Sequence, residues 1–299
     1  MLENFTELKK KIGSLTKKRV AIVAAQDVKT LQAVIKAKEE GFIEFVLLGD
    51  KKKIIKIGEE IGKQISPLDI INTETDEESA EKAVELVRQG KVDFIQKGLL
   101  QTATILKAVV NKEKGIATEK LLSHISILQI EGYHKLLAIT DGGMVLDQTL
   151  ANKKAMLENA VELFHRLGYK EPKVACMCAL EKENPKMPET VQAAALKEMN
   201  INGEIKGCLV EGPISFDIAM EKEAGQVKGF DSPVCGETDI IVTPTLVAGN
   251  MTIKSLYTFG HGVMAGCVLG AKCPIALTSR DAEVEERYYS LLLCSGLCG

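Results

Sequence analysis

Short apolar stretches alternate with helix-like patterns along almost the whole chain, and this alternation restricts the possible folds more than any other feature. The stretches are rich in Val and Ile, and many are apolar on both faces, as is typical of buried parallel strands. The alternation predicts an α/β fold with mainly parallel sheets and flanking helices. The predicted strands are residues 19–25, 44–49, 68–72, 92–96, 125–130, 136–140, 173–180, 207–212, 239–244, 266–270 and 274–278.

Helical patterns fill most of the intervals between these strands. Residues 76–90 begin with acids, repeat apolar residues at helical spacing and end in Gly, which is the composition expected at the two ends of a helix. Residues 151–168 and 188–199 show similar patterns, and the second of these begins with Pro, a residue favoured at the first helical position. The strands at 125–130 and 136–140 are joined by the five residues 131–135 instead of a helix, and we interpret this break in the pattern as the one hairpin of the chain.

The length of the chain predicts two domains. Its 299 residues exceed the usual size of a single domain, and the predicted hairpin interrupts the alternation near the middle. We expect a first α/β domain of residues 1–139 and 272–299, and a second α/β domain of residues 140–271.

Composition argues against several classes of protein. Charged residues make up 26% of the chain, the net charge is −3 and Trp is absent, whereas nucleic-acid-binding proteins usually carry a basic excess and stacking aromatic residues. No apolar run is long enough to span a membrane, and residues 1–13 lack the apolar core of a signal peptide. We therefore expect a cytoplasmic protein that binds neither nucleic acid nor membrane, with its eight Cys residues as reduced thiols in the core.

Glycines and polar residues gather where several predicted strands end, which is where open α/β sheets bind ligands. Taken singly, each loop is explained by ordinary structure, since Gly-Asn is a common turn, Pro begins helices and Lys97 can be a solvated rim residue. Their concentration at one predicted edge favours a site for a small anion, with amide groups free at a helix start and a lysine one turn on. The candidate substrate-binding residues are Lys97, Gly98, Thr102, Pro185, Lys186, Gly212, Pro213, Gly249, Asn250 and Lys254.

Several common signatures are absent from the sequence. There is no Walker-type phosphate loop, no dinucleotide fingerprint and no G-x-S-x-G nucleophile elbow. The four His residues do not stand at metal-ligand spacing. We therefore predict no metal site.

The segment 277-LTSRDAEVEERYYSLLL-293 places a hydroxyl, a guanidinium and carboxylates after the last strand. The simplest interpretation is that Ser279 or Asp281 caps the final helix and that the acids after it favour its positive end. This leaves Arg280 unexplained, because a cation beside a helix N-terminus is unfavourable unless it faces an anion. If the turn is near-helical, Ser279 and Glu286 share a face, and a hydroxyl, an anion-binding group and a base then line one pocket.

Six segments, in order along nearly the whole chain, resemble the phosphate acetyl/butyryltransferase family, and its butyryl branch most. The resemblance implies a two-domain fold like that of isocitrate and isopropylmalate dehydrogenases, with the active site in the interdomain cleft. It also implies that butyryl-CoA and phosphate are converted reversibly to butyryl phosphate and CoA, without metal or a tightly bound cofactor, by a homodimer or larger homo-oligomer. CoA is then a substrate. The segments are residues 97–110, 123–130, 183–196, 206–217, 233–256 and 270–286.

The resemblance also implies which residues are catalytic. In the acetyl branch, a Ser-Arg pair is followed, seven residues after the Ser, by an Asp that deprotonates the CoA thiol. Ser279 and Arg280 match this pair, and Glu286 stands at the Asp position with a longer side chain. The acids that compete with Glu286 for the role of base are Glu283, Glu285 and Asp281.

These residue types suit the reaction. A base must remove the thiol proton, a planar guanidinium suits the phosphate, and a hydroxyl can donate to the carbonyl oxygen. We expect direct attack by the thiolate in a ternary complex, with Ser279 orienting the substrate and not becoming acylated. Gly142 and Gly143 stand where relatives often carry two alanines, and we expect them to loosen the rim of the site and to affect acyl-chain preference.

Three alternatives remain open. The first is a phosphate acetyltransferase, which competition between acyl chains would reveal. The second is an oxidoreductase with the same fold, although the sequence has no matching cluster of metal-binding Asp residues. The third is a non-catalytic relative that binds CoA or phosphate.

Overall fold

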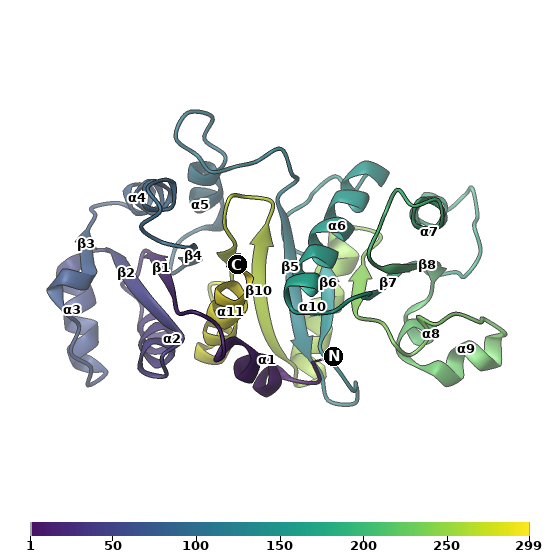
Figure 1. Ribbon diagram of the computed structural model, residues 1–299, viewed down its shortest axis with the longest axis horizontal. Coiled ribbons are helices and arrows are strands. Elements are labelled where there is room, and N and C mark those ends of the chain that lie inside the picture. Colours follow the sequence, from purple (N-terminus) through teal and green to yellow (C-terminus); the bar gives the residue numbers. More distant parts are fainter. Residues whose placement is uncertain (1, 299) are drawn as a thin grey trace. The chain divides into compact units, whose positions relative to one another are not determined.

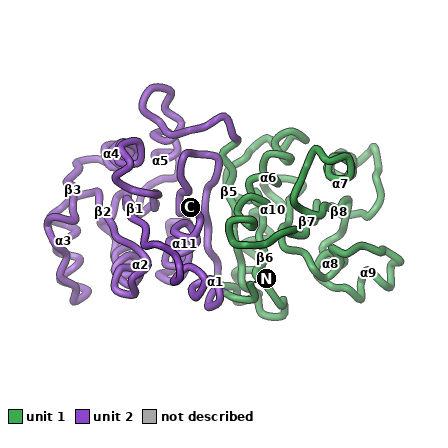
Figure 2. Tube along the Cα trace, viewed as in Figure 1, with its two compact units in different colours: residues 1–4, 121–263 green, residues 5–120, 264–299 purple. Residues whose placement is uncertain are grey.

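The computed structural model describes residues 2–298 and shows two compact units, each an α/β assembly (Figures 1 and 2). Unit 1 contains residues 1–4 and 121–263, and unit 2 contains residues 5–120 and 264–299. These bounds differ from those of the predicted domains, because pairing within the hairpin keeps both of its strands in unit 1. The domain boundaries drawn from the sequence stay a prediction.

Unit 2 is built on six strands in the order β3-β2-β1-β4-β11-β10. Neighbours run parallel except β10 and β11, which pair antiparallel with Cys267 opposite Ala276. The prediction of a single hairpin is therefore wrong, because a short turn through Gly270, at φ 102°, also reverses the chain. The strands are β1 (Lys18–Val23), β2 (Ile43–Gly49), β3 (Ile70–Asn72), β4 (Phe94–Lys97), β10 (Val263–Leu269) and β11 (Ile275–Ala276).

The helices of unit 2 form two layers, one on each face of these strands (Figure 1). α11 packs against α1 and α2, whereas α4 packs against α5 and contacts β1, β2 and β4. This follows from right-handed crossovers, because the chain moves outward from β1 to β3 and then returns to β4. The helices are α1 (Phe5–Ile12), α2 (Val28–Glu39), α3 (Lys51–Glu60), the 3₁₀ turn η1 (Pro67–Asp69), α4 (Asp76–Arg88), α5 (Thr102–Val109) and α11 (Val284–Leu297).

Short polar residues fix where three of these helices begin. The side chains of Asp27, Asp50 and Thr75 each accept a hydrogen bond from an amide N–H in the first turn of α2, α3 and α4 respectively. This satisfies donors that a helix start otherwise leaves unpaired. Asp50 directly follows the carboxyl end of a parallel strand, and Asp27 and Thr75 each stand one short loop beyond such an end.

Unit 1 is built on five strands in the order β5-β6-β9-β7-β8. The predicted hairpin is confirmed: β5 and β6 pair antiparallel, with Ile125 opposite Thr140, and the other pairs are parallel. α6 contacts β5, β6 and β9, and α7 contacts β7 and β8. The elements are β5 (Ser123–Gln129), β6 (Leu137–Thr140), β7 (Lys173–Met177), β8 (Leu209–Ile214), β9 (Ile240–Val242), α6 (Leu150–Arg166), α7 (Pro188–Ile201), α8 (Phe216–Met220), α9 (Lys222–Lys228) and α10 (Leu246–Phe259).

The predicted fold class is confirmed, because every predicted strand is present and the pairing is mainly parallel. α7 begins at Pro188, as the sequence predicts. Seven of the eight cysteines are buried, as expected of core thiols, and Cys298 is partly exposed. Within residues 2–298, no helix combines the length and the apolar character needed to cross a bilayer.

Candidate active site

Lys97 and the Ser279–Arg280 pair, far apart in the sequence, come together at one edge of unit 2. β4 and β11 are parallel neighbours, so the residues that follow them leave the sheet at the same carboxyl edge. The Nζ of Lys97 donates hydrogen bonds to the carbonyl oxygens of Thr278, at 3.2 Å, and Gly98, at 3.4 Å. The lysine therefore lies directly beneath the loop that carries the Ser-Arg pair.

Lys97 is a buried cation. Only 1% of it is exposed, so its interpretation as a solvated rim residue is wrong. Burial, together with the guanidinium groups of Arg287 and Arg280, lowers the pKa of Lys97 to about 8, whereas Asp27 and Glu286 act in the opposite direction. Its hydrogen-bond acceptors are neutral carbonyl groups, and no carboxylate of residues 2–298 lies within ion-pair distance. A titratable group perturbed by burial and by specific charges is typical of a functional site.

Arg287 is a second buried cation at this edge, and the sequence pattern gives no sign of it. It is fully buried on α11. Its Nη2 donates to the carbonyl of Arg280 at 3.1 Å, and its Nε donates to that of Ala282 at 3.2 Å. On the other side, its Nη1 donates to Thr30 Oγ1 at 3.2 Å, and its Nη2 lies 4.0 Å from Asp27 Oδ2. Arg287 therefore holds the loop before α11 against the start of α2.

Five charged side chains form a charge group at this edge. The three cations Lys97, Arg280 and Arg287 act together with the two carboxylates of Asp27 and Glu286, and a third carboxylate, that of Asp281, accepts a hydrogen bond from Ser279 beside them. Arg280 is exposed, and its guanidinium forms no hydrogen bond or ion pair with another described residue. This combination favours a small anion, which the free guanidinium can grip through two parallel hydrogen bonds.

The final helix begins later than the sequence predicts. α11 starts after Glu283, so neither Ser279 nor Asp281 caps it, and Ser279 Oγ donates to the Asp281 carboxylate instead. The prediction of a near-helical turn is therefore wrong, and the seven-residue spacing does not place Ser279 and Glu286 on one helical face. The reason is that carbonyl groups of this loop accept hydrogen bonds from the Arg287 side chain instead of continuing a helical ladder.

Glu286 differs from the three acids that compete with it. It is 4% exposed, lies in the first turn of α11 and is close enough to Lys97 to affect the pKa of that lysine. Glu283, Glu285 and Asp281 are all exposed, and Glu283 Oε1 pairs with Lys29 Nζ at 2.6 Å. Of the four acids, Glu286 is the one that shares the buried charge group.

Gly98 allows the chain after β4 to cross closely over the end of β1. Its amide donates to the carbonyl of Val23 at 2.8 Å, and a Cβ in its place would lie 2.4 Å from the carbonyl oxygens of both Val23 and Ala24. Thr102 is the first residue of α5, and the cap residue before it, Gln101, contributes no side-chain hydrogen bond. Both residues thus lie at the predicted edge, with Gly98 required by close packing.

The remaining predicted substrate-binding residues lie in unit 1. Pro185 and Lys186 are exposed in the loop between β7 and α7, and Lys254 is exposed on α10. Gly212 and Pro213 are buried inside β8, so the prediction that they form a loop after that strand is wrong. β8 continues past them because glycine permits close packing: a Cβ at position 212 would lie 2.7 Å from a Cβ on β7.

Gly249 and Asn250 hold α10 against the loop that follows β6. The Gly249 amide donates to the carbonyl of Thr245 at 3.0 Å, so the expectation that it is free to face an anion is wrong. Asn250 Nδ2 donates to the carbonyl of Gly142 at 2.9 Å. A Cβ on Gly142 would lie 2.6 Å from Ile253 Cδ1 and 2.7 Å from the backbone of Gly249. Gly142 therefore tightens this contact, contrary to the prediction that it loosens the rim.

Replacing Gly249 by Ala is expected to lower the free energy of unfolding by about 1–3 kcal/mol. A Cβ there would lie 2.7 Å from the carbonyl oxygen of Asp141, and this overlap outweighs the gain of about 1 kcal/mol that Ala brings to a helix. Urea unfolding measures the change. Gly143→Ala is the matched control, because its Cβ would make only an ordinary contact, 3.4 Å from His124. Equal stability of the two variants would show that the backbones of α10 and of the loop after β6 are not tightly packed at Gly249.

Comparison with known proteins shows the family of the chain. The sequence matches the phosphate acetyl/butaryl transferase family over residues 77–294, more than half of the chain. The chain belongs to this family. A phosphate butyryltransferase of Clostridium acetobutylicum (strain ATCC 824) is 38% identical over 299 residues, which cover 100% of this chain and 99% of that protein. The crystal structure of a branched-chain phosphotransacylase from Enterococcus faecalis V583 superimposes with a TM-score of 0.82 at 30% identity, covering 94% of this chain and 99% of that one.

The fold of this phosphate acetyl/butaryl transferase family member also occurs in dehydrogenases, as the resemblance implies. A 4-hydroxythreonine-4-phosphate dehydrogenase from Burkholderia phymatum has a TM-score of 0.55 at 14% identity and covers 95% of this chain and 99% of that chain. This likeness concerns the fold alone. The location of the active site in an interdomain cleft stays a prediction.

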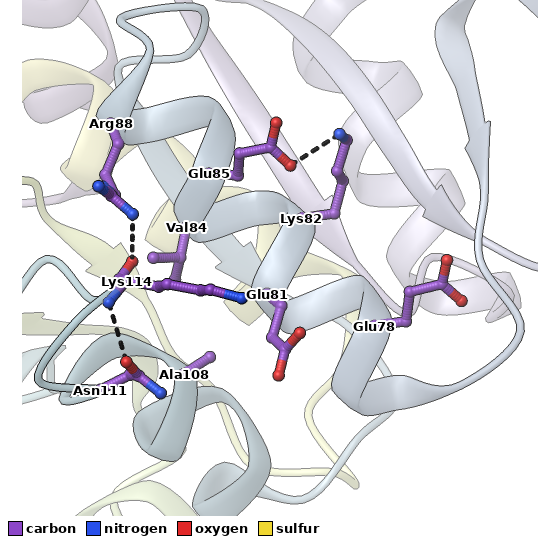
Figure 3. Close-up of a pocket in the computed structure, with 9 residues that line it drawn as sticks. All are labelled: Glu78, Glu81, Lys82, Val84, Glu85, Arg88, Ala108, Asn111 and Lys114. Atoms are coloured by element: carbon purple, nitrogen blue, oxygen red, sulfur yellow. Dashed lines mark hydrogen bonds and ion pairs between the residues drawn. The ribbon is translucent and has the colours of Figure 1, made fainter.

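A hollow of about 500 Å³ on α4 and α5 contains none of the predicted site residues (Figure 3). Lys82 Nζ pairs with Glu85 at 2.7 Å, Arg88 donates to the carbonyl of Lys114, and the Lys114 amide donates to Asn111 Oδ1. The hollow lies on helix faces and not at strand ends, and its acidic and basic residues are equal in number. We assign no part of the family's chemistry to it.

Proposed function

We propose that this chain transfers a short acyl group between CoA and inorganic phosphate, interconverting butyryl-CoA plus phosphate with butyryl phosphate plus CoA. The observation that carries the proposal is the grouping of cations at the edge of unit 2, where Lys97 and Arg280 lie near the buried Glu286. An anion site beside a buried carboxylate suits a reaction that needs a bound phosphate and a base. Membership of the family supports the same reaction class.

The roles of the residues follow from the reaction. In the direction of CoA acylation, Glu286 takes the proton of the CoA thiol, and the thiolate attacks the carbonyl carbon of the acyl phosphate. The Ser279 hydroxyl turns from Asp281 to donate to the carbonyl oxygen as negative charge develops there. The bond between that carbon and the phosphate oxygen then breaks, and Arg280 and Lys97 stabilise the departing phosphate. The acyl group passes directly to sulfur, and Ser279 forms no covalent bond.

Other parts of the proposal rest on the resemblance to the family. The substrate-binding roles of the unit 1 residues and of Thr102 stay predictions. The cytoplasmic location and the assembly into a homodimer or larger homo-oligomer also stay predictions. CoA is a substrate here and not a tightly bound cofactor. Phosphate acetyltransferase is the second candidate function, because the name of the family covers both acyl groups.

Release of free thiol from acyl-CoA is the test. With phosphate and no added metal, the protein is expected to release CoA from butyryl-CoA with a kcat/KM about tenfold or more above that for acetyl-CoA, since each added methylene changes binding severalfold or more. A reversed preference would identify an acetyltransferase. Absence of release from any short acyl-CoA would contradict the proposal, and turnover with a nicotinamide cofactor and metal would indicate the oxidoreductase alternative.

A further inference from the structure

A second hollow lies at the carboxyl edge of unit 2, where β1, β2 and β3 end. Its volume is about 390 Å³, and it is lined by residues at the ends of these three strands or shortly after them, including residues at the starts of α3 and α4. Since β1 is next to β4, the hollow lies beside the charge group of the candidate active site along the same edge. Gln26 lines the hollow, whereas its neighbour Asp27 lies 4.0 Å from Arg287. The turn that contains Gln26 and Asp27 therefore connects the hollow with the charge group.

The framework of the hollow is already bonded internally. Asp50 and Thr75 cap α3 and α4, and Asn72 Oδ1 accepts a hydrogen bond from the amide of Lys51 at 3.0 Å. The helix starts therefore do not themselves form the site. The ammonium group of Lys52 has no partner within residues 2–298, and that of Lys53 lies 3.4 Å from Asp50 on an exposed surface.

Gln26 gives a second indication that the hollow takes a ligand. Its Oε1 is buried and accepts no hydrogen bond from any residue between 2 and 298. Gly49 makes room for this amide, because a Cβ there would lie 1.9 Å from Oε1. Buried polar atoms are nearly always hydrogen-bonded, so this acceptor calls for an N–H or O–H donor from outside the chain.

The lining combines two kinds of chemistry. Lys52 and Lys53 attract a phosphate group, whereas Gln26 Oε1 and the carboxylates of Glu74 and Asp76 accept hydrogen bonds from amino or hydroxyl groups. A bare phosphate would be repelled by the three acids of the lining, Asp50, Glu74 and Asp76. A nucleotide with a phosphate on its ribose offers both an anion and N–H or O–H donors, and so matches the whole set.

We propose that this hollow binds the 3′-phosphoadenosine end of CoA, with the 3′-phosphate held by Lys52 and Lys53. The proposal rests on the proposed acyltransferase function. Ser279 lies in the loop after β11, and the two lysines lie at the start of α3, which follows β2. The distance from β11 to β2 is three strand spacings, or about 14 Å. CoA carries its thiol and its nucleotide at opposite ends of a long flexible arm, so one molecule extends along this edge from Glu286 to α3.

Comparison of CoA with 3′-dephospho-CoA tests the proposal. With butyryl phosphate as donor, the double variant Lys52→Ala/Lys53→Ala is expected to raise the KM for CoA about tenfold. The kcat and the KM values for 3′-dephospho-CoA and butyryl phosphate should stay unchanged. Lys56→Ala is the matched control, because this exposed lysine of the same helix lies outside the hollow and pairs with Glu60 at 3.8 Å. An unchanged KM for CoA, or equal changes for both acceptors, would overturn the proposal.

Calorimetry with adenosine 3′,5′-bisphosphate tests the site without turnover. We expect binding to the native protein and to Lys56→Ala, and binding about tenfold weaker to the double variant. Equal binding to all three proteins, or no binding to the native protein, would overturn the assignment of the hollow. Nucleotide binding with the expected losses but no acyl transfer would instead contradict the proposed function alone.

Discussion

Replacing Arg280 by Ala is expected to lower kcat/KM for phosphate about a hundredfold or more. Of the three cations in the charge group, Arg280 is the one whose guanidinium is exposed and forms no hydrogen bond or ion pair with another described residue. Loss of one donor to a charge that develops in the transition state commonly costs ~10²–10³ in rate. Stability should hardly change, by about 0.5 kcal/mol or less, because no contact of the folded chain is removed.

Thiol release with varied phosphate measures this effect, and urea unfolding monitors stability. Arg280→Lys should recover only part of the activity, because an ammonium group keeps the charge but loses the planar pair of donors. Arg166→Ala is the matched control, since that arginine is an exposed helix residue paired with Glu162 at 2.7 Å. If Arg280→Ala kept the native kcat/KM, the anion would have to be held by Lys97 and Arg287 without it.

Most of the fold could be predicted from the sequence because its signals are local. The alternation of apolar strands with capped helices defines the α/β class, and Pro188 marks the start of α7 to the residue. The hairpin of β5 and β6 was equally visible as two strands with no helix between them. The β10–β11 pair was missed because the sequence predicts two consecutive strands there without showing that they pair antiparallel.

The site could be predicted only in part, because its members meet through tertiary contacts. Lys97 was identified from its place after a strand, but its burial depends on the loop after β11, 181 residues away. Arg287 was missed because an arginine in an apolar helix is usually taken to reach solvent. Gly212 was misplaced by a few residues, because strand ends are set by pairing and not by composition.

Replacing Lys97 by Met is expected to make the protein more stable and less active. A lowering of the lysine pKa from 10.5 to about 8 corresponds to roughly 3 kcal/mol of unfavourable interaction with the charged form. Met fills a similar volume without that charge, so the free energy of unfolding at pH 7 should rise, by up to about 3 kcal/mol. The KM for phosphate should rise at least about tenfold, because the anion loses a buried, desolvated cation.

Proton linkage gives this prediction a further, quantitative form. Between pH 8 and 10.5 the native protein binds fewer protons at Lys97 than the unfolded chain does, so the stability contributed by this group rises with pH over that interval. The advantage of Lys97→Met should therefore be largest below pH 8 and disappear near pH 10.5. In the native enzyme, kcat/KM for phosphate should fall as pH rises through about 8, where the free lysine loses its charge.

Urea unfolding at pH 7 and pH 9.5, together with phosphate kinetics, separates the two possible roles of Lys97. Lys107→Met is the matched control, because Lys107 is exposed on the neighbouring α5 and should leave both measurements unchanged. If Lys97→Met destabilised the protein and left the KM for phosphate unchanged, Lys97 would serve to hold the loop through the Thr278 carbonyl. A gain in stability with a loss of phosphate binding identifies a charge that the fold retains at a cost of stability because the reaction needs it.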